Sequence, residues 1–372
     1  MQHKEHKTKI LISGGGTGGH VFPAIAIAEA LKSKLHNAEF LFVGAKGRME
    51  MEKVPAAGYQ IEAIPIAGFQ RRWTLKNLSF FFKLIISLIK ARRIIRNFAP
   101  DIVIGVGGYA SGPVLYVASR RKIPTLIQEQ NSYPGITNRI LARSVDRVCV
   151  AYDNMQRFFP KEKTYVTGNP VRQNVIKMVV DREEATKYFG LNPNRRIVLA
   201  MGGSLGARSV NQGIHNALEQ FREKEIQVIW QTGKQYIEQA QQAVNKEYTN
   251  MVYVTDFISR MDLAYAAADL VVSRAGAIAI SEIQAVQKPA IFVPSPNVAE
   301  NHQHKNAMAL VNYHAAKLVE DKDAAQNLGK EIDSLINNDK ELSKLNDNIA
   351  RLAKTDAANT IASVVIDMIN NK

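Results

Sequence analysis

Short, continuous apolar runs alternate along this chain with longer segments of helical periodicity, and the pattern occurs twice. The first half contains KILISG, EFLFVG, DIVIGVGG, PTLIQEQ and RVCVAY, and the second half contains RIVLAMGGS, QVIWQTG, MVYVTDF, LVVSRAG and PAIFVPSP. Strands that are apolar throughout are buried on both faces, as in parallel sheets covered by helices. The pattern therefore predicts an α/β protein built from doubly wound parallel sheets.

The length of the chain and the start of each half predict two domains. A chain of 372 residues exceeds what one core usually holds. Both halves begin with a strand that runs into glycines and then a helix, and this order is interrupted near residues 166–175. We predict an N-terminal domain over 1–170 and a C-terminal domain over 171–354, with a last helix, about 355–372, packing back on the first. Ligands of such sheets bind beyond the carboxyl ends of the strands, so we expect the site in a cleft that both domains face.

Composition excludes several classes of protein. A single cysteine, Cys149, cannot build a disulfide framework, which favours a reducing compartment. The first residues are charged and no stretch reaches about 18 uninterrupted apolar residues, so we expect neither a secretion signal nor a membrane-spanning helix. The net charge is +14, and residues 63–128 hold eleven Lys or Arg against one acid, Asp101. This excess suits nucleic acid, anionic lipid or a phosphorylated substrate.

The first strand runs into a glycine-rich turn, GGGTGGH, at residues 14–20, which matches the G-x-G-x-x-G pattern of dinucleotide-binding folds. Such folds also carry an acid at the end of the second strand, whereas this chain has Lys46 and Arg48 there, so a nicotinamide cofactor is disfavoured. A second turn, GVGGYASGP at 105–113, follows another strand. We expect both turns to offer N–H groups to an anion, with His20 directly after the first. Glycines that serve only a tight connection are the alternative.

Polar side chains follow other strands as well. QEQNSYPGITN places Glu129 and Asn131 directly after an apolar run, with capping and turn formation as the alternative roles. In SRAGAIAISE, residues 273–282, a helix opens at Gly276, so its free N–H groups and dipole suit a diphosphate. Glu282 is placed to accept ribose hydroxyls, unless it is a solvated surface residue. The two histidines of HQHKNA point to different helix faces, which disfavours a metal site.

A resemblance to the MurG family rests on seven motifs taken in order: GGGTGGHVFPA, GVGGYASGP, EQNSYPGITNR, GNPVR, GGSLGA, SRAGAIAISE and HQHKNA. These transferases move N-acetylglucosamine from UDP-GlcNAc onto undecaprenyl-diphospho-muramoyl-pentapeptide. The resemblance implies a GT-B fold, with two Rossmann-like, doubly wound domains facing across a cleft. It also implies inverting transfer to the C4 hydroxyl of the muramoyl sugar of lipid I, giving lipid II in peptidoglycan synthesis. The protein would be peripheral, at the cytoplasmic face of the bacterial inner (plasma) membrane.

The same resemblance assigns the UDP-GlcNAc donor to residues of both domains. They are Thr17, Gly18, Gly19, Asn131, Arg172, Ser204, Ile258, Ala277, Ile278, Ala279, Ile280, Ser281, Glu282 and Gln303. Residues on the acceptor side are Gly107, Gly108, Tyr109 and Asn138. Ile258 would contact uracil through its backbone. Two positions depart from the family pattern, because many members have His at Gln128 and Gln at Leu205.

Inversion requires a base for the acceptor hydroxyl. We expect His20 to be that base, because an imidazole with an ordinary pKa of about 6.5 accepts a proton near neutral pH. Glu129 is the alternative base, and a His20 that only caps the helix or packs on Phe22 is the noncatalytic alternative. The glycine turns and the helix N-terminus would meet the charge of departing UDP, so neither a cofactor nor a metal is expected. The D-x-D at 321–323 is interpreted as a solvated helix start.

Residues 74–97, TLKNLSFFFKLIISLIKARRIIRN, are predicted to dock on an anionic membrane surface. Their apolar arc of about 200° is wider than a core-facing stripe. Basic residues line one edge and the end of the helix: Lys76, Lys83, Lys90, Arg92, Arg93 and Arg96. A buried helix with a basic rim is the alternative. A UDP-GlcNAc epimerase, or a transferase to a different lipid, is the rival function, and no RNP-like motif indicates a nucleic-acid partner.

Overall fold

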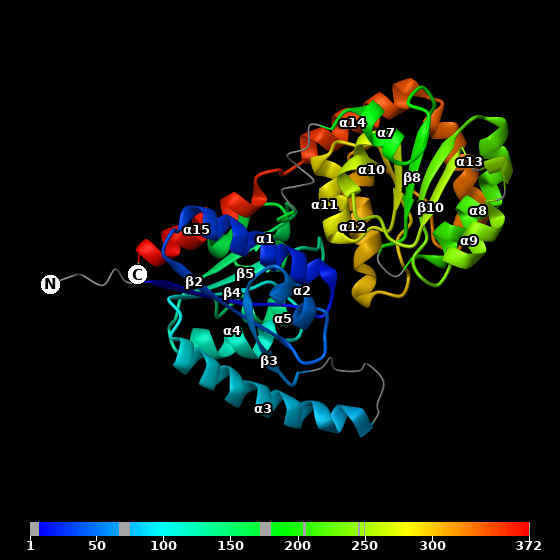
Figure 1. The fold of residues 1–372 in the computed structure, drawn as a ribbon. Coiled ribbons are helices and arrows are strands. Elements are labelled where there is room, and N and C mark those ends of the chain that lie inside the picture. Colours follow the sequence, from blue (N-terminus) through cyan, green and yellow to red (C-terminus); the bar gives the residue numbers. More distant parts are fainter. Residues whose placement is uncertain are drawn as a thin grey trace. The chain divides into compact units, whose positions relative to one another are not determined.

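The computed structural model describes residues 7–66, 75–171, 180–203, 206–244, 246–248 and 250–371. The chain divides into two compact units, Met1–Arg172 with Thr355–Lys372, and Gln173–Lys354. Each unit is a parallel sheet with helices on both faces (Figure 1). The doubly wound α/β architecture predicted from the alternating pattern is confirmed.

Unit 1 contains a parallel sheet with the strand order β3-β2-β1-β4-β5-β6-β7 within the described residues. The strands are β1 (Thr8–Ser13), β2 (Ala38–Ala45), β3 (Gln60–Ile64), β4 (Ile102–Gly105), β5 (Thr125–Glu129), β6 (Arg147–Val150) and β7 (Thr164–Val166). β1, β4 and β5 lie in the middle of the sheet and are buried almost throughout. The reversal of strand order beside β1 brings the loops after β1 and β4 together, because parallel strands end at the same edge.

Different helices cover the two faces of this sheet. The helices are α1 (Gly18–Lys34), α2 (Glu50–Ala56), α3 (Leu75–Phe98), α4 (Ser111–Arg120), α5 (Ile136–Leu141) and α15 (Ala357–Asn370). α1 and α15 pack around Ile12 and Ile361 in one hydrophobic cluster. α3, α4 and α5 pack around Leu11 and Val114 in another. The last helix of the chain is therefore part of the core of unit 1.

Unit 2 contains a parallel sheet with the strand order β10-β9-β8-β11-β12-β13 in the described part of the chain. Its strands are β8 (Ile197–Met201), β9 (Gln227–Gln231), β10 (Val252–Thr255), β11 (Leu270–Ser273), β12 (Ala290–Phe292) and β13 (Lys317–Leu318). Its helices are α7 (Arg182–Tyr188), α8 (Arg208–Glu223), α9 (Ile237–Ala243), α10 (Met261–Ala267), α11 (Ala277–Ala285), α12 (His302–Val311), α13 (Ala324–Ile336) and α14 (Asp339–Leu352). Trp230 and Phe221 are fully buried in its core.

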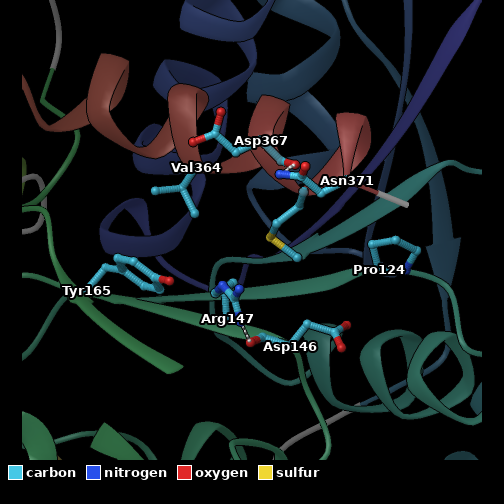
Figure 2. A pocket seen from close by; sticks show the side chains of 8 residues that line it. Pro124, Asp146, Arg147, Tyr165, Val364, Asp367 and Asn371 are labelled. Atoms are coloured by element: carbon cyan, nitrogen blue, oxygen red, sulfur yellow. Dashed lines mark hydrogen bonds between the residues drawn. The ribbon is translucent and has the colours of Figure 1, made fainter. Parts of the chain in front are cut away.

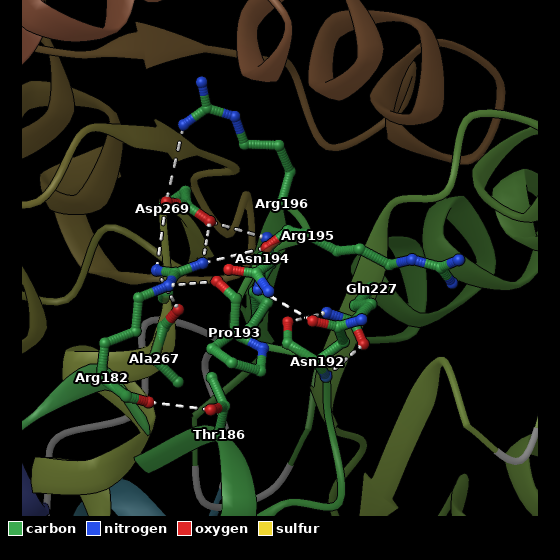
Figure 3. Close-up of polar contacts among 12 residues, drawn as sticks. Arg182, Thr186, Asn192, Pro193, Asn194, Arg195, Arg196, Gln227, Ala267 and Asp269 are labelled. Atoms are coloured by element: carbon green, nitrogen blue, oxygen red, sulfur yellow. Dashed lines mark hydrogen bonds and ion pairs between the residues drawn. The ribbon is translucent and has the colours of Figure 1, made fainter. Parts of the chain in front are cut away.

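A polar network fastens the amino ends of the central strands of unit 2 to α7 (Figure 3). The Asp269 carboxylate accepts the N–H of Ile197 at 2.8 Å and two guanidinium bonds from Arg182, at 2.9 and 3.2 Å. Arg182 also donates to the carbonyl oxygens of Pro193 and Ala267, each at 2.9 Å. The network occupies the end of the sheet opposite the carboxyl ends of the strands. Doubly wound sheets in general bind their ligands at the carboxyl ends.

Candidate functional site

A buried carboxylate fills the glycine turn between β1 and α1. Glu50, the first residue of α2, is fully buried and accepts the N–H of Gly16 at 2.8 Å and that of Ala45 at 2.9 Å. Gly15 has a φ of +152°, and a Cβ at this position would overlap the Glu50 carboxylate. Glu50 was not anticipated from the sequence, because it follows the second strand by five residues and belongs to the next helix. The turn is closed around this side chain, and the Gly16 N–H is already bonded.

The second glycine turn packs directly on the first. The Gly15 N–H donates to the Gly107 carbonyl at 3.3 Å, and a Cβ on Gly108 would overlap the carbonyl oxygen of Gly15. The expectation that both turns offer their N–H groups to an anion is therefore wrong for Gly15 and Gly16. Gly15 and Gly108 allow close approach of protein to protein, whereas Gly16 has a φ of +89° and no atom within 4 Å of a Cβ. Thr17, Gly18 and Gly19 stand at the start of α1, where N–H groups have no acceptor within the helix.

His20, in the first turn of α1, lies over the second glycine turn. Its Nδ1 is 3.1 Å from the Thr17 hydroxyl, and a Cβ on Gly107 would lie 2.8 Å from its Nε2. When Nδ1–H donates to Thr17, Nε2 is unprotonated and can accept a proton. The His20 ring does not cap α1, whose N-cap residue is Thr17. Tyr109, which follows Gly108 in the second turn, is half-exposed.

Glu129 ends β5 and is buried, and its carboxylate holds the following loop. One oxygen accepts the N–H of Asn131 at 2.9 Å and its side-chain amide at 3.2 Å, and the other accepts the Gly135 N–H at 3.1 Å and the Asn138 amide at 2.8 Å. Burial raises the pKa of this carboxyl, and the four hydrogen bonds oppose the rise. Both oxygens are occupied by these donors, which favours a positioning role over that of a base. The Asn138 Oδ1 is buried without a hydrogen-bond partner among the described residues.

Gln128, where many family members have His, lies in a buried amide network. Its Nε2 donates to Asn169 Oδ1 at 3.0 Å, and its Oε1 accepts from Gln130. Gln130 also donates to the Val106 carbonyl at 2.8 Å, and Asn169 donates to the Gln130 carbonyl at 3.0 Å. The network ties together the carboxyl ends of β4, β5 and β7. Gln128 is fully buried, so its departure from the family pattern affects packing beneath the loops.

In unit 2, the helix that follows β11 has an open N-terminus. Gly276 is the N-cap of α11, with φ −67° and ψ 139°, and a Cβ there would meet nothing within 4 Å. Ala277 and Ile280 are buried, Ile278 and Ala279 are partly exposed, and the Ser281 hydroxyl bonds the Ala277 carbonyl at 3.0 Å. The first N–H groups of the helix have no acceptor within it, and there is room beside its N-cap residue. An anion such as a diphosphate suits this end.

Glu282 lies on the same helix and is buried rather than solvated, with 7% of its surface exposed. The Tyr265 hydroxyl donates to its Oε2 at a long 3.5 Å. The solvated alternative is thus wrong, and the carboxylate is held against the core of unit 2. A carboxylate fixed this close to an open helix N-terminus can accept the hydroxyls of a sugar.

Two other predicted donor residues of unit 2, Ile258 and Gln303, are held by hydrogen bonds to neighbouring loops. The Ile258 N–H donates to Gln231 Oε1 at 3.1 Å, so the Ile258 carbonyl is the backbone group left for the uracil of the donor. Gln231 also donates to the Gly203 carbonyl at 3.1 Å and thereby joins the loops after β8 and β10. Gln303 Oε1 accepts the Ser295 N–H at 2.8 Å, which leaves its Nε2 without a bond in the described part of the chain.

Arg172, Ser204 and Leu205 lie outside the described residues. The D-x-D at 321–323 is not wholly solvated as expected. Asp321 accepts bonds from Arg274 and from the Ser209 hydroxyl, each at 2.5 Å, whereas Asp323 is the N-cap of α13. No group of three or more His, Cys, Asp or Glu within the described ranges is arranged to hold a metal ion.

The helix α3 exposes an apolar face. Its exposed large apolar residues are Phe81, Phe82, Ile85, Ile86 and Ile89. Lys83, Lys90, Arg92, Arg93 and Arg96 are also exposed, while the side chain of Lys76 lies outside the description. Leu88 packs on the core of unit 1, so it does not belong to the exposed face with Phe81. None of the helices that the structure describes is long and apolar enough to cross a membrane.

Two doubly wound parallel-sheet units, together with the family models that match them, define a glycosyltransferase of the GT-B class. Family models of the glycosyltransferase family 28 N-terminal and C-terminal domains match residues 10–150 and 197–361. A "UDP-N-acetylglucosamine--N-acetylmuramyl-(pentapeptide) pyrophosphoryl-undecaprenol N-acetylglucosamine transferase" of Phocaeicola vulgatus is 53% identical over 98% of this chain and 97% of its own. The protein of the same name from Parabacteroides distasonis is 50% identical over 98% of this chain and 100% of its own. The crystal structure of Acinetobacter baumannii MurG has a TM-score of 0.79 at 28% identity, covering 97% of this chain and 99% of its own. The chain belongs to the MurG family.

Proposed function

We propose that this protein transfers N-acetylglucosamine from UDP-GlcNAc to the C4 hydroxyl of the muramoyl sugar of undecaprenyl-diphospho-muramoyl-pentapeptide, with inversion at the anomeric carbon. The names of relatives 50 to 53% identical over nearly the whole chain support this proposal. The structural observation that carries it is the open N-terminus of α11 together with the buried Glu282 one and a half turns further on. A helix N-terminus and a fixed carboxylate suit the diphosphate and the ribose of UDP.

The chemistry divides between the two units. The acceptor oxygen attacks the anomeric carbon of the donor, the bond from that carbon to the diphosphate oxygen breaks, and UDP leaves with the electron pair. His20 takes the proton of the acceptor hydroxyl at Nε2, while Thr17 fixes the ring through Nδ1. The N–H groups of Ala277 and Ile278 meet the growing negative charge of the diphosphate, which lowers the barrier without any further proton transfer.

Other residues position these groups. The Ile258 carbonyl and the Gln303 amide nitrogen are the groups we assign to uracil and to the donor sugar. Glu129 shapes the loop that carries Asn131 and Asn138, and it is therefore a positioning residue rather than the base.

We place the protein at the cytoplasmic face of the bacterial inner membrane, where a lipid-linked acceptor is reached. The exposed apolar side chains of α3, together with its basic residues, support docking on an anionic lipid surface. The helix would lie in the interface, with Phe82 and Ile89 among the headgroups.

The test is an assay with radiolabelled UDP-GlcNAc and the purified undecaprenyl-linked acceptor in detergent. Label should move to the lipid fraction, with one UDP released for each transfer. Formation of an epimeric UDP-sugar without acceptor, or transfer to another lipid but not to this one, would overturn the proposal. UDP alone should also raise the melting temperature of the protein, since it binds the folded state.

A further inference from the structure

The loop between β13 and α13 joins parts of unit 2 that are far apart in the sequence. Within this loop, the Asp321 carboxylate accepts from the Arg274 guanidinium and from the Ser209 hydroxyl, each at 2.5 Å. Arg274 Nη2 also donates to the Ser209 hydroxyl at 3.1 Å, so the three side chains bond to one another. We call these three residues the Asp321 clamp.

Arg274 places the clamp beside the N-terminus of α11. It follows β11 directly and stands two residues before Gly276, the N-cap of α11. Its Nη1 donates to Asp321 and also to the Val293 carbonyl, the latter at 2.9 Å, just after β12. Only 16% of the Arg274 side chain and 25% of the Asp321 side chain are exposed. These bonds fix the turn that leads into α11.

Ser209 brings the clamp to a second helix N-terminus. It is the second residue of α8, the helix that follows the GGSLGA motif. Its hydroxyl donates to Asp321 and accepts from Arg274, so it both donates and accepts within the clamp. Asp321 therefore joins the first turns of α8 and α11, the helices that begin at the predicted donor motifs GGSLGA and SRAGAIAISE.

The neighbouring acid brings in a third helix. Glu320 Oε1 lies 3.2 Å from Nε2 of His304, the residue after Gln303 in α12. Asn306 Nδ2, also from α12, donates to the Ala275 carbonyl at 3.4 Å, in the turn before α11. The loop after β13 thus contacts three helices that carry or follow predicted donor residues.

We propose that Asp321 is a positioning residue for the UDP-sugar donor, and that it holds the first turns of α8 and α11 in place through Arg274 and Ser209. A hydrogen bond between a carboxylate and a guanidinium is charge-assisted and fixes the geometry of both groups. Helix N-termini that are already in place lose less freedom when an anion binds to them. Loss of the carboxylate removes the anion that pairs with the largely buried Arg274. The inference rests on the proposed UDP-GlcNAc donor.

Asp146 of unit 1 provides a comparison, because its carboxylate joins strands away from any predicted donor motif. It accepts the N–H and the hydroxyl of Thr125 at 2.8 and 2.9 Å, and so ties the amino ends of β5 and β6. Figure 2 shows this acid beside Arg147, which donates to the Asp146 carbonyl at 3.0 Å, at a space of about 460 Å³ that α15 also lines. Loss of the Asp146 carboxylate should therefore affect stability and not the donor.

The test titrates UDP into purified variants and measures the KM for each substrate. Asp321→Asn should bind UDP about tenfold more weakly and raise the KM for UDP-GlcNAc by a similar factor, with the KM for the lipid acceptor unchanged. Asp323→Asn removes the other acid of the same D-x-D, which makes no side-chain cap bond to α13, and should change UDP affinity by about twofold or less. Asp146→Asn should lower the melting temperature and leave UDP affinity unchanged.

The sign of the effect separates position from charge. UDP is an anion, so loss of a negative charge by itself strengthens its binding. Tighter UDP binding by Asp321→Asn would mean that the acid competes with the diphosphate for Arg274, and it would overturn the proposal. Equal losses in Asp321→Asn and Asp323→Asn, or loss of wild-type activity in EDTA that Mg²⁺ restores, would overturn it as well.

A double-variant cycle tests whether Asp321 acts through Arg274. Arg274→Gln with Asp321→Asn should bind UDP no more weakly than Arg274→Gln alone, whereas additive losses would overturn the clamp. If Asp321→Asn does not fold, Ser209→Ala replaces it, with an expected loss of UDP affinity of about threefold; an unchanged affinity would contradict the proposal. A wild-type protein that binds UDP but transfers nothing to the acceptor overturns the proposed function alone, because the UDP titrations still decide the clamp.

Discussion

Two loops of this protein look alike in the sequence and differ in the structure. After β1, Gly15 packs against the Glu50 carboxylate, and after β4, Gly108 packs against the backbone of Gly15, whereas a Cβ on Gly16 would meet nothing within 4 Å. After β11, Gly276 of unit 2 has nothing within 4 Å of the place where a Cβ would be. One loop is filled by a side chain of the protein, and the other has room beside its glycine.

The difference shows what a glycine between a strand and a helix reports. Such a glycine indicates that another group comes close to the backbone or that φ is positive, but this group can belong to the protein as well as to a ligand. In unit 1 the partner is Glu50, with the second glycine turn, and the closed turn presents His20 over Gly107. In unit 2 the partner is the proposed diphosphate. Catalysis and donor binding should therefore separate between the two loops.

The largest expected effect is that of His20→Ala on the closed loop. Loss of a general base typically lowers the rate by about 10² to 10⁴, and we expect that loss in kcat with little change in the KM for UDP-GlcNAc. Steady-state kinetics with both substrates measure it, and Glu129→Gln should reduce kcat less. A variant that keeps kcat and raises only a KM would make His20 a binding residue and break the division between the loops.

Replacing one glycine by alanine in each unit tests whether the glycine packs against protein or has room beside it. Gly108→Ala places a Cβ on the backbone oxygen of Gly15 at a φ of +81°, so we expect unfolding free energy to fall by about 1 to 3 kcal/mol or more. Gly276→Ala has room and an ordinary φ, so its stability should change by about 0.5 kcal/mol or less, while UDP binds at least about tenfold more weakly. Urea unfolding and UDP titration distinguish the two. If Gly276→Ala binds UDP normally, the open loop is not the diphosphate site.

Glu282→Ala tests whether the helix after Gly276 also binds the ribose of UDP. A charge-assisted hydrogen bond is worth about 1.5 to 3 kcal/mol, so UDP affinity should fall by about tenfold to a hundredfold. Isothermal titration measures it, and the exposed Glu238→Ala on α9 serves as the control for the loss of one acidic side chain. Unchanged affinity would remove Glu282 from the ribose.

The smallest effect concerns the outer face of unit 1 and not the loops. Phe82→Ser with Ile89→Ser should weaken sedimentation with anionic vesicles by about tenfold, because contact at headgroup level yields only part of the roughly 1.5 to 3 kcal/mol that full burial of a large apolar side chain contributes. UDP binding should be unchanged. Tyr313→Ser, at a similarly exposed aromatic residue of unit 2, is the control for the loss of one such side chain. Leu88→Ser should instead lower the melting temperature, since Leu88 packs on the core.

Much of the fold could be predicted from the sequence. The buried strands β4 and β11 are apolar at every position or nearly so, and such a run is compatible with few structures other than a sheet covered on both faces. The start of α11 after Gly276 was also predictable, because a helix end and its free N–H groups depend on local backbone geometry. Apolar runs and helix ends depend on residues that are neighbours in the sequence.

Tertiary structure alone decided which side chains fill the loops. Glu50 reaches Gly16 across 34 positions, and Gln128 reaches Asn169 across 41, so no local pattern announces either hydrogen bond. Glu129 follows its strand as a free catalytic carboxylate would, yet four donors of the next loop occupy it. Phe81 and Leu88 share an apolar period on α3, but the packing of that helix on unit 1 leaves Phe81 exposed and partly buries Leu88. Periodicity records that a residue is apolar or that a chain turns, whereas the partner it meets is set by how distant segments pack.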